Sequence, residues 1–368
     1  MSPRVLFTCG REPEYPRNEV MRLCLEHSCE VMPITDSSRS ALVRHLRLFW
    51  RLLWVPWNQV DLVFVGFLGH LLLPFVRILT RKPVVLDAFV SVYDTLCFDR
   101  QVFSPMSPAG RLALWLDRFC CKLADLIILD TQTHVRYFNE IIGIAHNKLR
   151  SVYVGCNEGL FYPRSSESTM PGEAKSCLVL FYGGFLPLQG VEVIVRAAKL
   201  LENEAGLHFR IIGKGMLTPQ IEGLVNDIKL TNIDFYPPVP LSTLPDQISQ
   251  ADICLGGHFG ASAKAGRVIA GKTFQCLAMG KATIVGDNDA NRELLSHGQD
   301  AWFCRMNDPN ALAEAIQTLY QDSKMRHHLG QQAYQTFMKK ASIQVLSGPI
   351  GEIVASLLTQ PPRTETGN

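Results

Sequence analysis

Phe181-Tyr-Gly-Gly-Phe-Leu-Pro-Leu-Gln-Gly190 and Ala251-Asp-Ile-Cys-Leu-Gly-Gly257 share one local pattern, in which a short apolar strand runs into a glycine turn and then toward a helix. Helix N-termini behind glycine turns present unpaired backbone N–H groups and the positive end of the helix dipole, and both features favour a bound phosphate. The second stretch is followed by three basic residues, Lys264, Arg267 and Lys272. Two such turns beside a set of cations predict a ligand that carries a pyrophosphate.

Outward from these stretches, strand and helix patterns alternate along the whole chain of 368 residues. Such alternation is typical of parallel sheets with helices on both faces, so the predicted fold class is α/β. The polar stretch 164–176 separates domains over residues 1–165 and 176–345, and a helix within 346–360, behind Gly348-Pro349, is expected to return to the first domain. Ligands of open α/β sheets bind at the carboxyl ends of the strands, and we expect them in a central cleft that both domains face.

Six strands are predicted in each domain. Those of the first domain are Val5–Thr8, Cys29–Met32, Leu62–Val65, Val84–Leu86, Leu126–Leu129 and Ser151–Val154. Those of the second domain are Leu178–Tyr182, His208–Ile212, Ile233–Tyr236, Ile253–Leu255, Thr283–Val285 and Ala301–Cys304. The apolar stretch 62–79 is interrupted by glycine, proline and arginine, so it is expected to form a strand, a turn and a buried helix rather than a membrane span.

The composition excludes several classes of protein. The net charge of +2 argues against bulk binding of nucleic acid, so no nucleic-acid partner is expected. The 11 cysteines show neither CxxC pairs nor the Cys/His spacing of zinc sites, which favours reduced thiols in a cytoplasmic protein. No signal peptide precedes the first predicted strand, and no GxGxxG follows it, which argues against a dehydrogenase.

Several motifs resemble those of the family 4 glycosyltransferases. The turn Gly183–Gly190 keeps Gly183, Pro187 and Gly190 of that family's Gly-Arg-x-x-Pro-x-Lys-Gly pattern. Further matches are Ile211-Ile-Gly-Lys-Gly215, Ala251-Asp-Ile-Cys-Leu255, Leu277-Ala-Met-Gly-Lys281, Arg292-Glu-Leu-Leu295 and Val154-Gly-Cys-Asn-Glu-Gly-Leu-Phe-Tyr-Pro163. The resemblance covers most of the chain and is strongest from Leu178 to Met338.

This resemblance implies a GT-B fold of two facing Rossmann-like domains and a retaining hexosyltransferase or related glycosyltransferase. The donor would be a nucleotide sugar, most simply a UDP- or GDP-sugar, and the reaction would use neither a cofactor nor a bound metal. The acceptor would be lipid-linked or a glycan, as in the assembly of surface polysaccharide or glycolipid.

The sequence departs from the family at the donor site. Gly184 replaces the arginine of the turn, and Gln189 replaces its lysine. At the two positions of the family's Glu-x7-Glu signature stand Arg267 and Gln275. Gln275 can still hydrogen-bond a ribose hydroxyl, and Arg267 can clamp a phosphate together with Lys272. These changes indicate a variant donor site.

Negative charge grows on the leaving diphosphate when a glycosidic bond of the donor breaks. Gly183, Gly184, Arg267 and Lys272 are the candidates to stabilise that charge, with solvated loop cations as the alternative. The resemblance places the base and ribose of the donor near Gly213, Val239 and Gln275. Gln189, at the position of the family's lysine, is a further candidate for donor binding. Glu293 is either a further donor-site residue or only a helix cap.

Candidates on the acceptor side are less distinct. Gly10, Arg17 and Asn18 lie in the loop behind the first predicted strand and could approach the diphosphate or an anionic acceptor. Asp87 ends the predicted strand Val84–Leu86 and could take the proton of an acceptor hydroxyl. Two rivals, Asp94 and Asp99, follow it, and each of these residues has a structural alternative. The pair in Asp287-Asn-Asp289 resembles a metal-binding motif, but a turn with an N-cap is favoured over a metal site.

The stretch 40–57 predicts a basic amphipathic helix. Arg44, Arg47 and Arg51 recur at helical spacing, and leucine, phenylalanine and tryptophan fill the other positions. Such a helix suits docking to an anionic membrane surface, for example at the cytoplasmic face of the inner membrane. The alternative is a helix packed on the sheet with its arginines in water.

Two further functions remain open at this point. A GT-B epimerase of nucleotide sugars shares the same implied fold. A catalytically silent paralogue that binds a sugar nucleotide would also explain the changes at Gly184, Gln189, Arg267 and Gln275.

Overall fold

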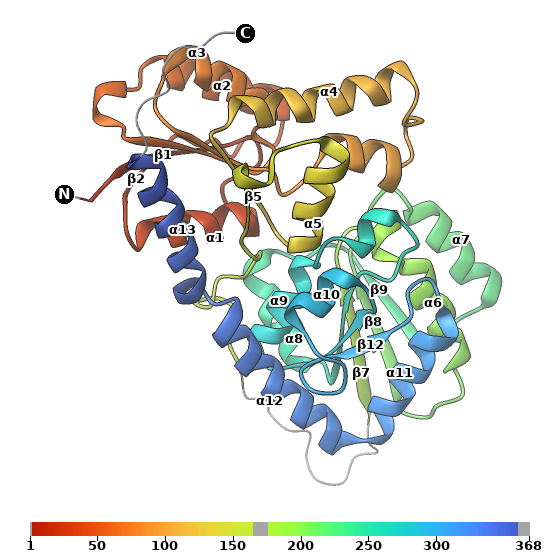
Figure 1. The fold of residues 1–368 in the computed structure, drawn as a ribbon. Helices are drawn as coiled ribbons and strands as arrows, with labels where there is room; N and C mark the ends of the chain where they lie inside the picture. Colours follow the sequence, from red (N-terminus) through yellow and green to blue (C-terminus); the bar gives the residue numbers. More distant parts are fainter. Residues whose placement is uncertain (1, 165–175, 360–368) are drawn as a thin grey trace. The chain divides into compact units, whose positions relative to one another are not determined.

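The computed structural model describes residues 2–164 and 176–359 (Figure 1). The chain divides into two compact units, each with its own six-stranded sheet. Residues 1–155 and those from 343 onward make up the N-terminal unit, and residues 156–342 make up the C-terminal unit. Almost all of the predicted linker lies outside the described residues.

The N-terminal unit contains a parallel sheet with the strand order β2-β1-β3-β4-β5-β6. Its strands are β1 (Arg4–Cys9), β2 (Glu30–Pro33), β3 (Leu62–Gly66), β4 (Val84–Asp87), β5 (Leu126–Leu129) and β6 (Leu149–Ser151). Its α-helices are α1 (Pro16–Glu26), α2 (Ala41–Leu53), α3 (Leu72–Leu79), α4 (Pro108–Leu123), α5 (Gln132–Tyr137) and α13 (Ile343–Leu358). The predicted α/β class is confirmed for this half of the chain.

The strands of this sheet are apolar on both faces because helices cover both. Successive side chains of a strand point to opposite faces. Val5 and Phe7 of β1 therefore pack in one cluster with residues of α1 and α13. Leu6 packs in a second cluster with residues of α2, α3 and α4. This arrangement explains why β1, β3 and β4 are nearly continuous runs of buried apolar residues.

The last helix is longer than predicted. The sequence predicts a break at Gly348-Pro349, but α13 runs from Ile343 to Leu358 with Pro349 inside it. A proline inside a helix costs about 3 kcal/mol. Burial of Leu346, Ile350 and Val354 in the cluster that includes α1 offsets that cost.

The C-terminal unit repeats the parallel arrangement with the order β12-β11-β10-β7-β8-β9. Its strands are β7 (Cys177–Tyr182), β8 (Leu207–Ile212), β9 (Ile233–Tyr236), β10 (Ile253–Gly257), β11 (Ala282–Gly286) and β12 (Trp302–Cys304). Its α-helices are α6 (Val191–Leu200), α7 (Thr218–Ile228), α8 (Leu244–Gln250), α9 (Gly271–Ala278), α10 (Asp289–Leu294), α11 (Pro309–Gln321) and α12 (Ser323–Lys340). In a parallel sheet the carboxyl ends of all strands meet at one edge, so the turns behind β7, β8 and β10 become neighbours.

One predicted strand lies in the wrong place. The sequence predicts a strand at Ser151–Val154, whereas β6 spans Leu149–Ser151. The carbonyl groups of Val152 and Tyr153 accept hydrogen bonds of 2.8 Å each from Nη1 of Arg17. A side chain therefore takes the place of a neighbouring strand there, and apolar periodicity does not reveal this.

The helical stretch Ser323–Leu358 is long and apolar enough to cross a membrane by length and composition alone. One such stretch is weak evidence for a span. Much of it is packed, since α12 contacts α9 and β11, and α13 contacts α1. The stretch 62–79 forms β3, a 3-10 turn at Gly69–Leu71 and α3.

Candidate functional site

A cavity of about 240 Å³ opens at the carboxyl ends of β7 and β8 in the C-terminal unit. Its lining comes from three turns that follow neighbouring strands, which is where an open α/β sheet binds its ligands. The lining residues are Tyr182, Gly183, Gly184, Ile212, Gly213, Lys214, Pro238, Val239 and Leu244. Four of the predicted donor-site residues, Gly183, Gly184, Gly213 and Val239, thus meet at one cavity.

Two glycines make this cavity possible. Gly183 has φ +144° and Gly213 has φ +148°, which are backbone conformations that side chains disfavour. A β-carbon on Gly213 would lie 1.9 Å from the carbonyl oxygen of Gly183. The two turns therefore approach each other at backbone distance, and glycine at 213 is required by packing as well as by φ.

Lys272 lies in the first turn of α9, and its ammonium group reaches back to the turn behind β7. Nζ donates a hydrogen bond to Oε1 of Gln189 and lies 3.8 Å from the centre of the Phe181 ring. A β-carbon placed on Gly183 would lie 3.1 Å from the same nitrogen, and one on Gly257 would lie 3.9 Å from it. Three predicted residues, Gly183, Gln189 and Lys272, are thus brought together from three separate elements.

The Lys272 ammonium is buried without an acid to balance it. Its side chain is 7% exposed, and among the described residues no carboxylate comes within ion-pair distance. Burial lowers the pKa of Lys272 to about 7, because the charged form loses its hydration. A buried cation without a counter-charge is costly, and an anionic ligand would relieve that cost.

His258, which was not among the predicted site residues, directly follows β10 on the same side of the unit. Burial lowers its pKa to about 3, and the positive charges of Lys272 and Lys264 act in the same direction. The imidazole is therefore neutral near pH 7. Its Nδ1 is buried and has no hydrogen-bond partner among the residues that the structure describes. A glycine pair before a histidine at a strand end is the only sequence signal for it.

Gln275 is also buried, one turn further along α9. Its Oε1 accepts a hydrogen bond of 3.0 Å from the hydroxyl of Tyr182. Tyr182 lines the cavity, so this pair connects a cavity wall to the second position of the family signature. Tyr182 was not among the predicted residues, since a tyrosine at the end of an apolar strand gives no functional signal by itself.

The other predicted donor-site residues, Arg267 and Glu293, are not among the residues that line the cavity. Arg267 is half-buried behind the 3-10 turn Ala263–Gly266, and its backbone N–H donates to the Lys264 carbonyl at 3.0 Å. Glu293 lies in α10, which is capped by the side chain of Asn288 rather than by Glu293. The roles assigned to Arg267 and Glu293 stay predictions.

The aspartates beside Asn288 behave as in a capped turn. Asp287 accepts two hydrogen bonds of 2.7 Å from Arg292, and the Asn288 side chain accepts one from the Asn291 backbone N–H, also at 2.7 Å. Among the described residues, no group of three or more His, Cys, Asp and Glu side chains could hold a metal ion. All eleven cysteines are buried, and none of them forms a disulfide within the part of the chain that the structure describes.

Asp87 lies at the carboxyl end of β4 in the N-terminal unit, where it forms a buried ion pair. Both Asp87 and Arg17 have side-chain exposures of 0%, and Nε and Nη2 of Arg17 each come within 3.0 Å of a carboxylate oxygen. Burial raises the pKa of Asp87, and the positive charge of Arg17 acts against that rise. The carboxylate is already engaged, so the geometry of this unit gives no support to its predicted role as a proton acceptor.

Gly10 also has a packing explanation. A β-carbon there would lie 2.0 Å from the carbonyl oxygen of Leu68. Its N–H donates to the Phe67 carbonyl at 3.0 Å, and its own carbonyl accepts from Nε of Arg44 at 2.9 Å. Both backbone groups are therefore engaged within the unit. The neighbouring candidate Asn18 is buried and accepts from the Phe67 N–H at 2.9 Å.

The rival acids also lie inside the N-terminal unit. Asp94 and Asp99 are both buried within a short π-helical turn, Asp94–Asp99. The N–H of Asp94 donates to the hydroxyl of Ser91 at 2.9 Å. Burial gives neither carboxylate an open approach to a substrate within this unit.

The C-terminal unit, which contains this cavity, is also the part of the chain that matches a known protein family. Residues 176–322 match the family model described as glycosyl transferases group 1. A D-inositol 3-phosphate glycosyltransferase of Acidothermus cellulolyticus is 25% identical over 216 residues, which cover 52% of this chain and 48% of that protein. The chain spans about half the length of the curated relatives it matches.

Solved structures extend the similarity to the whole fold. A sucrose-phosphate synthase from Thermosynechococcus elongatus superposes with a TM-score of 0.76 at 14% identity, covering 97% of this chain and 99% of that one. The Anabaena protein HepE, solved with UDP-glucose, superposes with a TM-score of 0.70 at 15% identity, covering 96% and 99%. The fold is therefore GT-B, and the predicted resemblance to glycosyltransferases of the family 4 type is confirmed.

Proposed function

We propose that this protein is a glycosyltransferase that uses a nucleotide-sugar donor, with Lys272 facing the diphosphate of that donor. The observation that carries the proposal is the unbalanced buried ammonium beside Gly183, Gly257 and Gln189. Glycines on two sides leave room for phosphate oxygens close to Nζ. The negative charge of a diphosphate would supply the counter-charge that residues 2–164 and 176–359 do not provide.

The proposed chemistry follows from where charge develops. The bond between the anomeric carbon and the diphosphate oxygen breaks, and its electron pair goes to that oxygen. The acceptor hydroxyl bonds to the anomeric carbon and passes its proton to the leaving diphosphate. The protonated form of Lys272 stabilises the negative charge on the leaving oxygen. A bound diphosphate raises the pKa of Lys272 above about 7, because an anion favours the charged form. In this proposal the ammonium group of Lys272, rather than a metal ion, balances the charge of the diphosphate. Chelation of divalent metals should therefore leave the rate unchanged.

The cavity of about 240 Å³ is proposed to hold the nucleoside part of the donor. Tyr182 and Val239 offer apolar surface, and the backbone at Gly213 offers polar groups. The Tyr182 hydroxyl donates to Oε1 of Gln275, so the amide group of Gln275 is directed away from it and can donate to a ribose hydroxyl. A UDP-sugar is the first donor to test, since HepE was solved with UDP and with UDP-glucose.

The acceptor is proposed to be lipid-linked or a glycan, in surface polysaccharide or glycolipid assembly, with retention of configuration. This proposal rests on the resemblance and on the exposed apolar residues of α2, such as Trp50 and Trp54. Action at the cytoplasmic face of an inner membrane follows from the same proposal. Proton NMR of the first-formed product reports its anomeric configuration, and an inverted product would contradict retention.

The test of the central proposal is a binding and hydrolysis screen with UDP-, GDP-, ADP- and dTDP-sugars. We expect one nucleotide to raise the melting temperature of the wild type and its sugar to be released slowly. Lys272→Met keeps the length and apolar stem of the side chain but removes the charge, and it should lose both effects. Lys324→Met, which removes an exposed cation of α12 outside the cavity lining and should keep both effects, is the matched control. No binding of any nucleotide by the wild type would overturn the proposal.

A second candidate function is a catalytically silent protein that binds a sugar nucleotide. Arg267 and Gln275 stand where the family has two glutamates, and Gln275 is engaged by Tyr182. Nucleotide binding without sugar release or transfer would favour this candidate. A GT-B epimerase would instead convert the donor sugar without any acceptor, which analysis of the recovered nucleotide sugar detects.

A further inference from the structure

Helix α2 exposes an apolar surface that the fold does not use. Its inward side is formed by Leu48 and Leu52, which are fully buried in the N-terminal unit. Other large apolar side chains of the helix and its C-terminal cap remain in solvent. Their exposed fractions are 70% for Leu42, 59% for Leu46, 63% for Trp50, 50% for Leu53 and 73% for Trp54.

The exposed apolar surface continues over two neighbouring helices. Helix α3 packs against both α2 and α4, and the three helices lie together in the N-terminal unit (Figure 1). Leu71 precedes α3 and Ile78 lies within it, with exposed fractions of 58% and 81%. The loop before α4 and α4 itself add exposed residues, namely Val102, Phe103, Met106, Leu112 and Trp115. We call the exposed apolar residues of α2, α3, α4 and this loop the apolar face.

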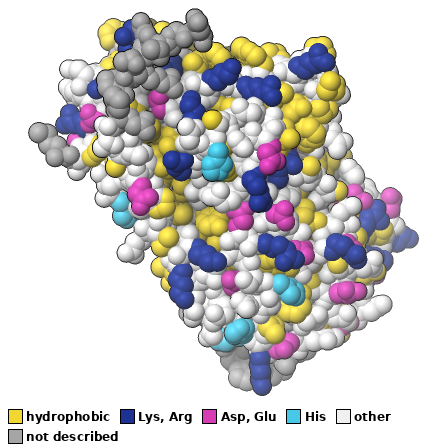
Figure 2. Space-filling model, viewed as in Figure 1, with side chains coloured by type: hydrophobic (Ala, Val, Ile, Leu, Met, Phe, Trp, Pro, Cys, Tyr) yellow, Lys and Arg dark blue, Asp and Glu magenta, His cyan; other side chains and the backbone are white. Residues whose placement is uncertain are grey.

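The exposed charged residues within the segment 41–123 are all basic. Residues 41–123 are all described, and none of their acids is exposed: Asp61 is half-buried, and Asp87, Asp94, Asp99 and Asp117 are buried. The same segment exposes seven basic residues, which are Arg47, Arg51, Arg81, Arg100, Arg111, Arg118 and Lys122. Figure 2 shows Lys and Arg interspersed with apolar side chains near the top of the view. Glu140, on the π-helical turn Phe138–Ile142 that packs against α4, is an exposed acid beside this segment, but the basic residues outnumber it. An apolar surface with a net positive charge matches an anionic surface.

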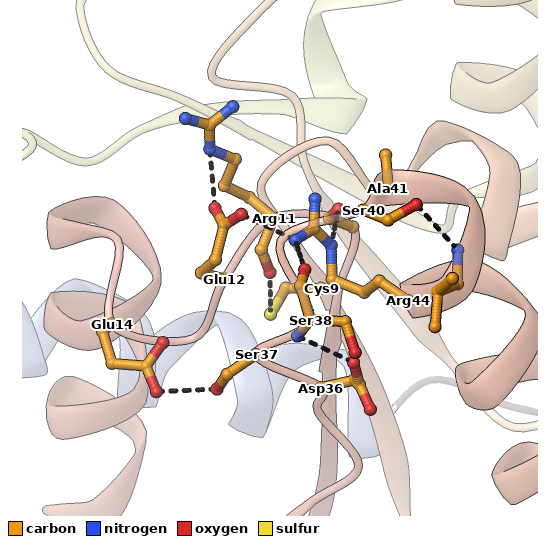
Figure 3. Close-up of polar contacts among 12 residues, drawn as sticks. Cys9, Arg11, Glu12, Glu14, Asp36, Ser37, Ser38, Ser40, Ala41 and Arg44 are labelled. Atoms are coloured by element: carbon orange, nitrogen blue, oxygen red, sulfur yellow. Dashed lines mark hydrogen bonds and ion pairs between the residues drawn. The ribbon is translucent and has the colours of Figure 1, made fainter.

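The predicted arginine stripe of α2 is only partly solvated. Arg44 is buried, donates to the Gly10 carbonyl at 2.9 Å and pairs with Glu12 at 2.6 Å (Figure 3). Its neighbours Arg47 and Arg51 stay exposed, each 3.7 Å from Asp36. Arg44 therefore ties α2 to the loop behind β1, and a fixed helix holds its exposed residues in one orientation.

We infer that the apolar face, with its seven exposed basic residues, docks this protein on an anionic phospholipid bilayer. Trp50, Trp54 and Trp115 are exposed and suit the boundary between lipid headgroups and acyl chains. There the polar N–H of an indole ring can face the headgroups while its apolar body contacts the acyl chains. The basic residues add attraction to anionic headgroups, which decays within a Debye length. The inference deepens the proposed use of a lipid-linked acceptor, but binding to a bilayer needs no turnover.

The test is flotation of the full-length protein with vesicles of phosphatidylcholine alone and of phosphatidylcholine mixed with phosphatidylglycerol. We expect binding to the mixed vesicles, weakening as salt is raised. Trp50→Ser with Trp54→Ser, and separately Arg111→Glu with Lys122→Glu, should each reduce binding roughly tenfold or more. All four side chains are exposed, so folding is expected to persist. Leu200→Ser with Met216→Ser, and Lys324→Glu, are matched controls on the C-terminal unit and should bind as the wild type.

The outcomes separate this inference from the proposed enzymatic function. Lys272→Met should still bind vesicles, and the tryptophan variant should still bind nucleotide. Equal binding to neutral and anionic vesicles, or no effect of either double variant, would overturn the inference. A change in oligomeric state for the tryptophan variant, without vesicle binding by the wild type, would assign the face to a second protein copy instead.

Discussion

The carboxyl edges of the two sheets are built from similar strands but treat charge in opposite ways. At the edge of the C-terminal unit, Lys272 is buried with a carboxamide and an aromatic ring as its partners. At the edge of the N-terminal unit, Arg17 is buried with Asp87 and two backbone carbonyls. The first edge leaves a charge for a ligand to neutralise, whereas the second neutralises its own.

The N-terminal unit contains a second buried side chain with an acidic partner from the same unit. Nδ1 of His134 lies 2.7 Å from Oδ1 of Asp130, and both side chains are buried. The comparison indicates that a buried charge marks a ligand site only when the protein leaves it unbalanced. Asp87 and Lys272 look equally functional in the sequence, and only the partner of each tells them apart.

The largest expected effect is the loss of stability when the Arg17–Asp87 pair is broken. Arg17→Met leaves the carboxylate of Asp87 buried and unpaired, which should lower the free energy of unfolding by about 3–5 kcal/mol. Urea unfolding followed by circular dichroism measures this loss. The double variant Arg17→Met with Asp87→Leu removes both charges and should recover much of it. A fully stable single variant would mean that Asp87 is not dependent on Arg17.

The next largest effect is the loss of turnover in Lys272→Met. In contrast to Arg17→Met, this variant should lose activity and keep its stability. Removing a cation aimed at a leaving group costs about 10²–10³ in kcat. Stability should stay the same or rise, because the variant no longer buries an unbalanced charge. Sugar transfer or hydrolysis and urea unfolding are measured on the same preparation. A variant that loses stability but keeps its turnover would reverse the comparison between the two edges.

Much of the fold could be predicted because parallel sheets leave strong local signals. Apolar runs such as Leu62–Val65 and Leu126–Leu129 can bury both faces of a strand, and each coincides with a strand of the sheet. The wrong predictions involve contacts distant in sequence. Arg17 takes the carbonyls that were expected to pair in a strand at Ser151–Val154, and packing against α1 carries α13 through Pro349.

The site was predictable to the extent that strand ends converge. Gly183, Gly213 and Lys272 are far apart in sequence, but the topology brings their turns to one edge. The missed residues Tyr182 and His258 have ordinary sequence contexts, and only burial and partners distinguish them. For the same reason, the inward turn of Arg44 and the engagement of Asp87 could not be read from helical spacing or from a strand end.

A smaller effect is expected from pH. Burial lowers the pKa of Lys272 to about 7, so diphosphate affinity should fall by up to about tenfold per unit as pH rises above that value. Without ligand the sign is opposite: between about pH 7 and the ordinary lysine pKa the unfolded chain holds more protons, so this group makes the protein more stable as pH rises. Titration calorimetry and urea unfolding across this range measure both slopes. If Lys272→Met showed the same slopes as the wild type, another group would be responsible.

The smallest expected effect is a gain in nucleotide affinity when Gly184 is replaced by arginine, the residue that the family has at this position. A β-carbon there would meet its nearest neighbour, Cγ of Leu186, at 3.6 Å, and the residue is exposed at the mouth of the cavity. Gly184→Arg should therefore fit and place a second cation near the diphosphate. A partly solvated charge pair contributes up to ~1 kcal/mol, or about fivefold tighter nucleotide binding. Gly184→Met is the uncharged control of similar reach. Weaker binding by the arginine variant alone would show that two cations repel each other there, and that Lys272 by itself already matches the charge of the ligand.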